Sequence, residues 1–305
     1  MRQPLSIYTR AARLESQRLA NRISRKFQKW INKQTPEAQS RKARPLIDLS
    51  VIEAAFCELG VTRGDRILIH SGIGRLGKIK GGAPGIMALL REKVGQDGLL
   101  LFPAFPFATL MHEYVSSNPE FDLRTSSTKM GALAEVALAA PDRIRSLHPT
   151  HSVSGFGQDV AHFLEDHHLD DTPFGPHSPF WRLADAGGKI LIMGVGLSSV
   201  TSFHLTEDRM GEEFPVRVYL DKVFRLKCRD TLGETVEIIT RCHDPFISQV
   251  RDCYIVEDLF IQEGIYRKIL VGQHFIGMID AQRMDLCLQR LAKQEHLTIY
   301  GRIWG

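Results

Sequence analysis

Three short runs of unbroken apolar residues constrain the fold of this chain more than any other feature. Residues 65–70 (DRILIH), 98–103 (GLLLFP) and 189–195 (KILIMGV) each have an apolar centre bounded by charged or turn residues. A strand buried on both faces has this composition, because its side chains alternate between two faces and both faces must be apolar. Helical patterns separate the runs. The alternation predicts an α/β fold with a mixed sheet flanked by helices.

Caps, periodicity and turn residues predict the other elements. Helices are expected at 48–59, 84–94, 130–140, 161–167, 247–263 and 280–292. A loop is expected at 146–157, an antiparallel hairpin at 216–242 around Thr231-Leu232-Gly233, and a final strand at 297–303 that closes the sheet. Five scattered cysteines without a C-x-x-C pair indicate no disulfide framework. The longest apolar stretch, 98–110, contains two prolines, so no membrane span or export is expected.

Positive charge is concentrated in the first 44 residues. They contain 12 Lys or Arg and two acidic residues, whereas the rest of the chain has 27 basic and 33 acidic residues. Within 5–33, apolar side chains recur at steps of three and four opposite a basic face, which predicts a cationic amphipathic helix. We therefore expect a basic helical arm over 1–44 and an acidic α/β domain over 45–305.

Three interpretations of this arm are open. Its apolar stripe can dock on the domain or on a second subunit, which would make the chain a homo-oligomer. It can instead lie on an anionic membrane surface, since Trp, Phe and Leu opposite Lys and Arg is the composition of such helices. Nucleic-acid binding is disfavoured, because the remaining chain is acidic and contains no recognisable reader module. The expected location is cytoplasmic, at the inner membrane face under the second interpretation.

A glycine-rich loop follows the first apolar run. Residues 72–77 spell G-x-G-x-x-G, but residues 78–83 separate these glycines from the next helix, which disfavours a dinucleotide site. Open backbone amides and basic side chains predict an anion-binding loop instead, with an ordinary surface turn as the alternative. The residues concerned are Gly72, Arg75, Lys78, Lys80, Gly81 and Gly82.

Two histidine clusters are candidates for chemistry. Residues 146–152 (SLHPTHS) place His148 and His151 among hydroxyls, and residues 201–207 (TSFHLTE) follow the third apolar run. If the second cluster opens a helix, His204 and Glu207 share one face. A carboxylate orients an imidazole and favours its protonated form, which makes His204 a candidate base. A hydrogen-bonded surface pair without chemistry is the alternative.

Other chemistries have weaker support. Zinc binding by the three histidines just named would lack a tight ligand spacing, so no metal is expected. A covalent acyl-enzyme through Ser152 or a cysteine would lack a nucleophile elbow. His167 is expected at a solvated helix end, and His243 has no partner pattern.

Seven blocks of this chain occur in a characteristic order. They are D-R-I-L-I-H-S with R-L-G and G-G (65–82), G-L-L-L-F-P (98–103), M-G-A-L-A-E (130–135), R-S-L-H-P-T-H-S with G-F-G (145–157), S-P-F-W-R-L (178–183), K-I-L-I-M-G-V-G (189–196) and T-S-F-H-L-T-E (201–207). In order and spacing the chain, from about residue 47 to its end, resembles the aminoglycoside 3-N-acetyltransferase family.

The resemblance implies direct transfer of an acetyl group from acetyl-CoA, the co-substrate, to an amine of an amino sugar or aminoglycoside. It implies His204 as general base with Glu207 as its partner, and His148 and His151 in the same site. The residues that it assigns to the coenzyme or its thioester are Ser71, Gly72, Arg75, Lys78, Gly81, Gly82, Ser178 and Thr201. The family usually has H-S-S-L where this chain has H-S-G-I at 70–73, so one hydroxyl is missing.

The biological use of such an activity is open. Antibiotic inactivation is one use, and acylation of an amino sugar in a surface-glycan or natural-product pathway is another. A non-catalytic, membrane-tethered scaffold of the same fold is the alternative from a different class. The pairing of His204 with Glu207 argues against a scaffold, which has no need of it.

Overall fold

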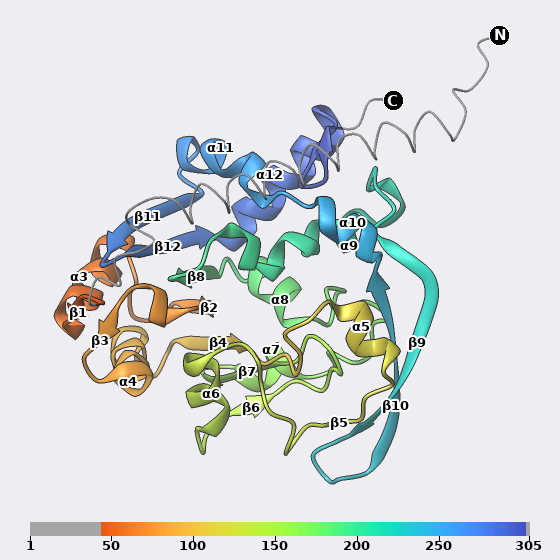
Figure 1. The fold of residues 1–305 in the computed structure, drawn as a ribbon, viewed down its shortest axis with the longest axis horizontal. Coiled ribbons are helices and arrows are strands. Elements are labelled where there is room, and N and C mark those ends of the chain that lie inside the picture. The colour runs from red at the N-terminus through yellow and green to blue at the C-terminus, as the bar shows by residue number, and fades with distance from the viewer. Residues whose placement is uncertain (1–43, 303–305) are drawn as a thin grey trace. The chain divides into compact units, whose positions relative to one another are not determined.

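A seven-stranded mixed sheet forms the centre of the computed structural model, which describes residues 44–302 (Figure 1). Its strand order is β11-β12-β8-β2-β4-β7-β6. The three middle strands β8, β2 and β4 are parallel, and the strands on either side pair antiparallel. The predicted mixed α/β fold is confirmed. The predicted arm over 1–44 lies outside the described residues except for Arg44, so its interpretations stay predictions.

The strands differ widely in length. They are β1 (Leu46–Ile47), β2 (Arg66–Ser71), β3 (Lys78–Ile79), β4 (Leu99–Pro103), β5 (Phe121–Asp122), β6 (Ile144–Arg145), β7 (Val153–Gly157), β8 (Lys189–Met193), β9 (Tyr219–Arg229), β10 (Thr235–His243), β11 (Tyr266–Val271), β12 (His274–Asp280), β13 (Leu297–Thr298) and β14 (Gly301–Arg302).

The helices are mostly short. They are α3 (Leu49–Leu59), α4 (Gly82–Val94), α5 (Met111–Ser116), α6 (Ala132–Ala139), α7 (Val160–Leu164), α8 (Pro179–Asp185), α9 (Leu205–Met210), α10 (Pro245–Val250), α11 (Glu257–Gln262) and α12 (Ala281–Gln294). Single turns of 3-10 helix include η2 (Leu197–Ser199), η3 (Thr201–His204) and η5 (Cys253–Val256).

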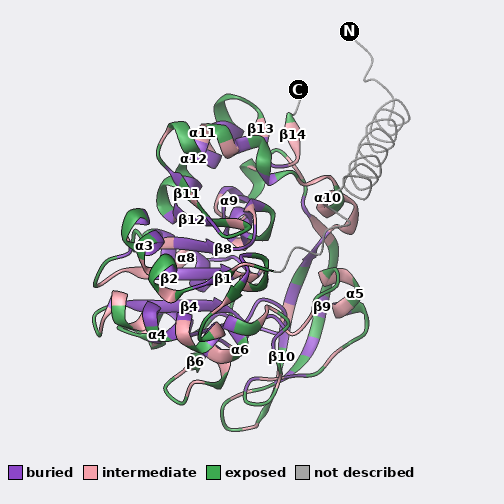
Figure 2. Cartoon of the chain, turned by 60° about the vertical axis from the view of Figure 1, so that its left-hand side comes forward, coloured by how far each residue is buried: buried purple, intermediate pink, exposed green. Residues whose placement is uncertain are grey.

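The middle strands are apolar at their centres because helices cover both faces of the sheet. In β2, Ile67 and Ile69 pack into the core under α3, α4 and α6, and Leu68 packs into the core under α7, α8 and α12. The side chains of β4 and β8 likewise alternate between these two cores. These strands are buried along their length in Figure 2. The three apolar runs in the sequence are therefore the three parallel strands.

A second sheet lies beside the first and has the order β10-β9-β5. β9 and β10 form the long ribbon at the right of Figure 1. Their turn spans 230–234, where Gly233 has a φ of +88°, so the hairpin predicted around Thr231-Leu232-Gly233 is confirmed. At its far end this hairpin brings His243 toward the large sheet.

Three predictions about local structure were wrong, and one hairpin was not predicted. Part of the predicted loop 146–157 is the strand β7, whose Gly155 lies so close to β4 that a Cβ would come within 2.6 Å of the Leu100 carbonyl oxygen. The predicted helix 247–263 is broken into α10, η5 and α11, because Arg251 is extended and Asp252 caps a new turn. The hairpin β11–β12 was missed. β13 and β14 pair only with each other, so within the described residues the predicted last strand does not close the sheet.

Two broad exclusions can be compared with the structure. All five cysteines are free thiols, as expected from their spacing. None of the helices within residues 44–302 is both long and apolar enough to cross a membrane.

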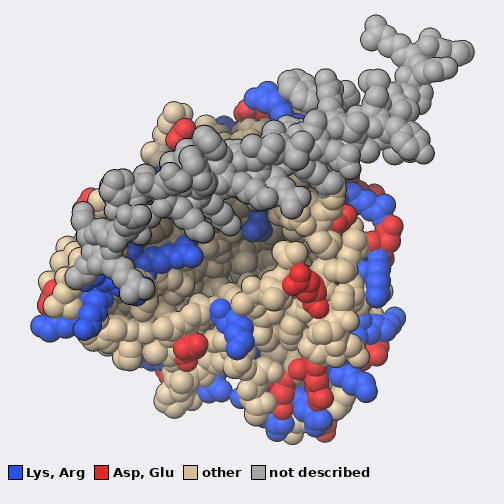
Figure 3. All heavy atoms as spheres, viewed as in Figure 1, with Lys and Arg blue, Asp and Glu red and all other residues tan. Residues whose placement is uncertain are grey.

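Parallel strands end together, and here a cavity forms at that edge. Residues 69–71 at the end of β2, Pro103 at the end of β4 and Val195 after β8 share one cavity of about 290 Å³. Open α/β sheets bind ligands at this position, outside the carboxyl ends of the strands. The face turned toward the viewer in Figure 1 is hollowed near its middle, with Lys and Arg side chains at the edges of the hollow (Figure 3).

Candidate active site

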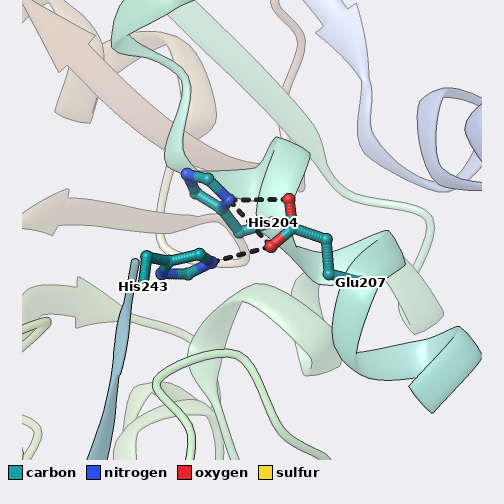
Figure 4. Close-up of side chains that lie close together, drawn as sticks. All are labelled: His204, Glu207 and His243. Atoms are coloured by element: carbon teal, nitrogen blue, oxygen red, sulfur yellow. Dashed lines mark hydrogen bonds and ion pairs between the residues drawn. The ribbon is translucent and has the colours of Figure 1, made fainter. Parts of the chain in front are cut away.

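A buried hydrogen-bond network is centred on the Glu207 carboxylate (Figure 4). His204 Nδ1 lies 3.0 Å from both carboxylate oxygens, as the i, i+3 spacing predicted. His243 Nε2 lies 2.7 Å from Oε2, and the Tyr300 hydroxyl donates to Oε1 at 2.6 Å. Glu207 and both histidines are buried. The pair therefore does not lie on the surface.

Separate parts of the chain position this network. β8 ends at Met193, and η2, η3 and α9 follow it directly, so His204 and Glu207 stand beyond the edge of the sheet. His243 is the last residue of β10, and Tyr300 lies in the turn between β13 and β14. Three segments, far apart in sequence, thus converge on one carboxylate.

The network fixes which nitrogen of His204 carries a proton. A carboxylate only accepts hydrogen bonds, so Nδ1 donates to Glu207 and Nε2 keeps the lone pair. The Arg251 guanidinium donates to that lone pair, with Nη1 2.5 Å from Nε2. His204 is thus oriented with its basic nitrogen away from Glu207.

Burial controls the charge of this pair. It lowers the pKa of His204 to about 4, outweighing the Glu207 carboxylate, which raises it. Burial alone would raise the pKa of Glu207, but the two histidines hold that pKa well below its usual range. The carboxylate thus favours the protonated ring, as predicted, but burial outweighs its effect on the pKa. At neutral pH His204 is a neutral base beside an ionised carboxylate.

A larger cavity of about 760 Å³ adjoins the other side of Glu207. Four of the carboxylates that line it are Asp170, Asp171, Asp208 and Glu212. Burial raises the pKa of Asp208 to about 6, although its Oδ1 accepts a hydrogen bond from the Tyr219 hydroxyl at 2.8 Å. The cavity is thus acidic and attracts cations.

The smaller cavity contains part of the predicted coenzyme loop. Ser71, Gly72 and Arg75 line it together with Lys129, which the sequence analysis did not single out. A Cβ at Gly72 would lie 3.0 Å from Val195 Cγ1, which explains why this chain has glycine where the family has a second serine. His70 also lines the cavity, and its buried Nε2 has no partner among the described residues.

Other residues of that loop lie elsewhere. Lys78 belongs to β3 and pairs with β1, and Gly81 and Gly82 begin α4. None of the three lines either cavity. Gly81 and Gly82 have φ angles of +81° and +57°, so the turn into α4 also favours glycine at both positions.

Ser178 and Thr201 have different surroundings. Ser178 is fully buried, and its Oγ accepts a hydrogen bond from the Trp181 amide as the N-cap of α8. Thr201 begins η3, and its buried Oγ1 has no hydrogen-bond partner among the described residues. Neither side chain lines the cavities. Their predicted place near the thioester is untested.

The first histidine cluster is also buried. His151 packs against Phe174 with ring centres 5.0 Å apart, and another neighbour of Phe174 is His204, at 5.3 Å. His148 is fully buried and stacks on His167 at 4.5 Å. Burial lowers the pKa of both His148 and His151 well below the usual value. The structure thus places His151 one ring away from His204 and His148 farther off.

Two histidines discounted from sequence are structurally central. His167 was expected in solvent but is fully buried. Both of its ring nitrogens are hydrogen-bonded there, Nδ1 to the Ser146 hydroxyl and Nε2 to the Pro173 carbonyl oxygen. His243 was set aside for want of a pattern, yet it bonds Glu207. His243 and Glu207 are 36 residues apart in sequence and meet because of the β9–β10 hairpin, so no local pattern could have predicted their contact.

Alternative chemistries can be compared with these positions. Among the described residues, potential metal-ligand atoms lie within 4.8 Å of one another in the set His204, Glu207 and His243. This set differs from the three histidines considered for zinc. Their hydrogen bonds and the neighbouring Arg251 cation suit a proton-transfer network better than a cation site. Ser152 is bonded to Arg145 and to the Ser146 carbonyl, and neither partner can act as the base that a nucleophilic serine needs.

Fold and network together define a class of protein, namely an α/β protein with a buried histidine–glutamate pair beside an acidic cavity. The model of the aminoglycoside 3-N-acetyltransferase family matches residues 68–292. The chain belongs to this family of N-acyltransferases.

Individual relatives agree with this assignment. Aminoglycoside N(3)-acetyltransferase III of Serratia marcescens is 36 % identical over 51 % of this chain and 62 % of its own length. Type IX of Micromonospora chalcea is 30 % identical over 76 % of this chain and 88 % of its own. The chain spans 62 % of the length of the first of these relatives.

Solved structures confirm the fold. Aminoglycoside acetyltransferase AAC(3)-Xa superposes with a TM-score of 0.68 and 25 % identity, covering 83 % of this chain and 94 % of its own. AAC-IIIb, solved with CoASH, superposes with a TM-score of 0.67 and 24 % identity over 82 % of this chain and 98 % of its own.

Proposed function

We propose that this chain transfers the acetyl group of acetyl-CoA directly to an amine of a cationic amino sugar such as an aminoglycoside, with His204 as general base. One observation carries the proposal. The segment 195–208 runs from the smaller cavity, at Val195 and Ser199, to the larger acidic cavity, at Glu207 and Asp208. His204 lies within that segment, between the two.

The two cavities differ in charge in the way that two such substrates require. The smaller one has Arg75 and Lys129 with the glycine loop, which suits a phosphorylated coenzyme. The larger one is lined by six carboxylates and two arginines, which suits a polycation. Coenzyme and amino sugar then approach His204 from opposite sides.

The chain's residues then act as follows. An amine arrives as an ammonium without a lone pair, and His204 Nε2 accepts a proton from it. The freed nitrogen attacks the thioester carbonyl carbon, so an amide C–N bond forms and the C–S bond breaks. Of the two protons lost by nitrogen, one protonates the departing sulfur and the other passes to solvent. Glu207 stabilises the imidazolium throughout.

The basic experiment is thiol release from acetyl-CoA. We expect release with sisomicin or a gentamicin, each bound by a solved member of this fold, and none with the same compounds after chemical acylation of their amines. If no amine in a panel of amino sugars releases thiol, the proposed function is wrong. Release with simple amino sugars but not with aminoglycosides would favour the biosynthetic role.

The smaller cavity predicts which basic residue contacts the coenzyme. Arg75→Met is expected to raise the KM for acetyl-CoA about tenfold, because a charge-assisted hydrogen bond is lost. Lys78→Met removes the same charge from β3, outside the cavity lining, and should have the smaller effect. Equal effects of the two variants in steady-state kinetics would contradict the assignment.

The larger cavity predicts a residue that selects cationic substrates. Asp208→Asn is expected to raise the KM for sisomicin about tenfold and to leave the KM for acetyl-CoA unchanged, because one ammonium partner is lost. Asp97→Asn is the matched control, since Asp97 pairs with Arg63 at the surface and lines neither cavity. The proposal fails if the two variants bind sisomicin alike.

Two finer points of the proposal concern the arm. Peripheral contact with an anionic membrane through 5–33, at the inner face of the cytoplasmic membrane, would place the enzyme near surface-glycan precursors. Docking of the same stripe on a second subunit would instead make a homo-oligomer. The composition of the arm is consistent with both.

A further inference from the structure

Arg251 covers the only atom of His204 that can accept a proton. Its Nη1 lies 2.5 Å from His204 Nε2, and its Nη2 donates to the Ser198 carbonyl oxygen at 3.2 Å. Neither contact is to a carboxylate. Because Nδ1 of His204 is engaged with Glu207, a substrate ammonium can reach the base only where this guanidinium now lies.

We propose that Arg251 occupies the position of the reacting ammonium, so that substrate binding exchanges one cation for another at His204 Nε2. The inference rests on the function proposed above and extends it to a residue that positions the amine. The nitrogen to be acetylated would lie where Arg251 Nη1 lies, within hydrogen-bond distance of the lone pair.

Charge balance supports the exchange. Glu207 is a buried carboxylate, and a buried charge without a compensating one is strongly destabilising. In the free protein the Arg251 cation compensates it through His204. The substrate ammonium supplies the same charge when it takes that place, and the imidazolium supplies it once the proton has moved. The network then carries one positive charge at every stage.

The surroundings of Arg251 allow its side chain to leave. The residue lies between α10 and η5 with extended backbone, and α10 has no buried residue. The next residue is fixed, because the Asp252 amide donates to the Ile299 carbonyl oxygen and its side chain caps η5. Rotation of the Arg251 side chain therefore suffices, without disturbing the core or the chain path.

Removal of the guanidinium tests the proposal. Arg251→Met retains the length of the stem and removes the charge. At pH 8, without substrate, the ¹⁵N signal of His204 Nε2 is expected to move toward that of an unbonded imine nitrogen. The Kd of sisomicin, measured by calorimetry without acetyl-CoA, is expected to fall about tenfold, since no charge-assisted bond must be displaced. A His204→Gln spectrum assigns the signal.

Arg283→Met is the control, because Arg283 is an exposed arginine bonded to the backbone of Glu263 and Gly264. It should change neither quantity. An unmoved His204 signal, or an unchanged or weaker affinity for sisomicin in Arg251→Met, would overturn the proposal, and a purely structural role would weaken affinity. Both readouts need no turnover, so failure of the natural chain to acetylate amines would overturn the proposed function separately.

Discussion

The variant His204→Gln is expected to lose about 10²- to 10⁴-fold in kcat/KM for acetyl transfer, the usual contribution of a general base. Glutamine retains a polar side chain of similar reach but has no basic nitrogen at neutral pH. At this buried position the imidazole supplies both the hydrogen bond to Glu207 and the lone pair at Nε2. Binding of acetyl-CoA, measured by calorimetry, is expected to persist, because His204 lines neither cavity.

The chain contains a matched control for this variant. His162 and Glu165 form the same i, i+3 pair at 3.1 Å, but on the exposed surface. His162→Gln should leave kcat/KM unchanged. A His204→Gln enzyme with full activity would remove His204 as the base, and the two variants behaving alike would show that burial of the pair has no part in catalysis.

Acid is expected to unfold this protein between about pH 6.5 and about pH 5, because buried neutral histidines must charge. Five buried histidines have a lowered pKa, to about 4 for His70 and His204 and about 3 for His167, and well below the usual value for His148 and His151. Burial is the main cause in each case, since it disfavours the charged ring. The folded state therefore keeps these rings neutral at pH values where the unfolded chain protonates them.

The sign follows from proton linkage. Above the unfolded pKa of about 6.5 both states are neutral, so these groups do not change stability. As pH falls toward the folded pKa values the unfolded state binds more protons and is favoured, by about 2 kcal/mol at about pH 5 for each of His70, His167 and His204. Asp208 has a raised pKa of about 6, so its protonation stabilises the folded state as pH falls and offsets about 1 kcal/mol of this loss. The free energy of unfolding of a folded domain is only about 5–15 kcal/mol.

Urea titrations at pH 7, 6, 5.5 and 5, followed by circular dichroism, measure this effect. His70→Asn should flatten the fall in the free energy of unfolding, because His70 makes no hydrogen bond at Nε2 that the substitution would break. His162→Gln, on the surface, should leave the slope unchanged. A free energy of unfolding that is constant from pH 7 to pH 5 would contradict the buried neutral state of these rings.

Local patterns predicted some parts of the structure well. The three apolar runs became parallel strands because their side chains reveal burial on both faces without any partner being known. His204 and Glu207 met because residues three apart on a helical turn are neighbours whatever surrounds them. The β9–β10 turn was recognisable because Gly233 adopts a backbone conformation that favours glycine.

Other features had no local signal. β11 and β12 were missed although Gly272 has a φ of +61°, because their alternation is weak and β8, which pairs with β12, is distant in sequence. The helix predicted over 247–263 failed at Arg251, where the chain turns to bring a cation to His204. In both places contacts across the fold outweighed local preference.

The sequence by itself determined the buried parallel strands, the histidine–glutamate pair and the family, because each depends on residues close together in the chain or on their order. Tertiary structure alone decided that His243, Tyr300 and Arg251 surround that pair, and that it lies between two cavities of different charge. It also decided the charge state of His204, because the pKa reflects how completely the fold removes water from the ring. Desolvation is a property of the packed molecule, and no pattern of neighbouring residues encodes it.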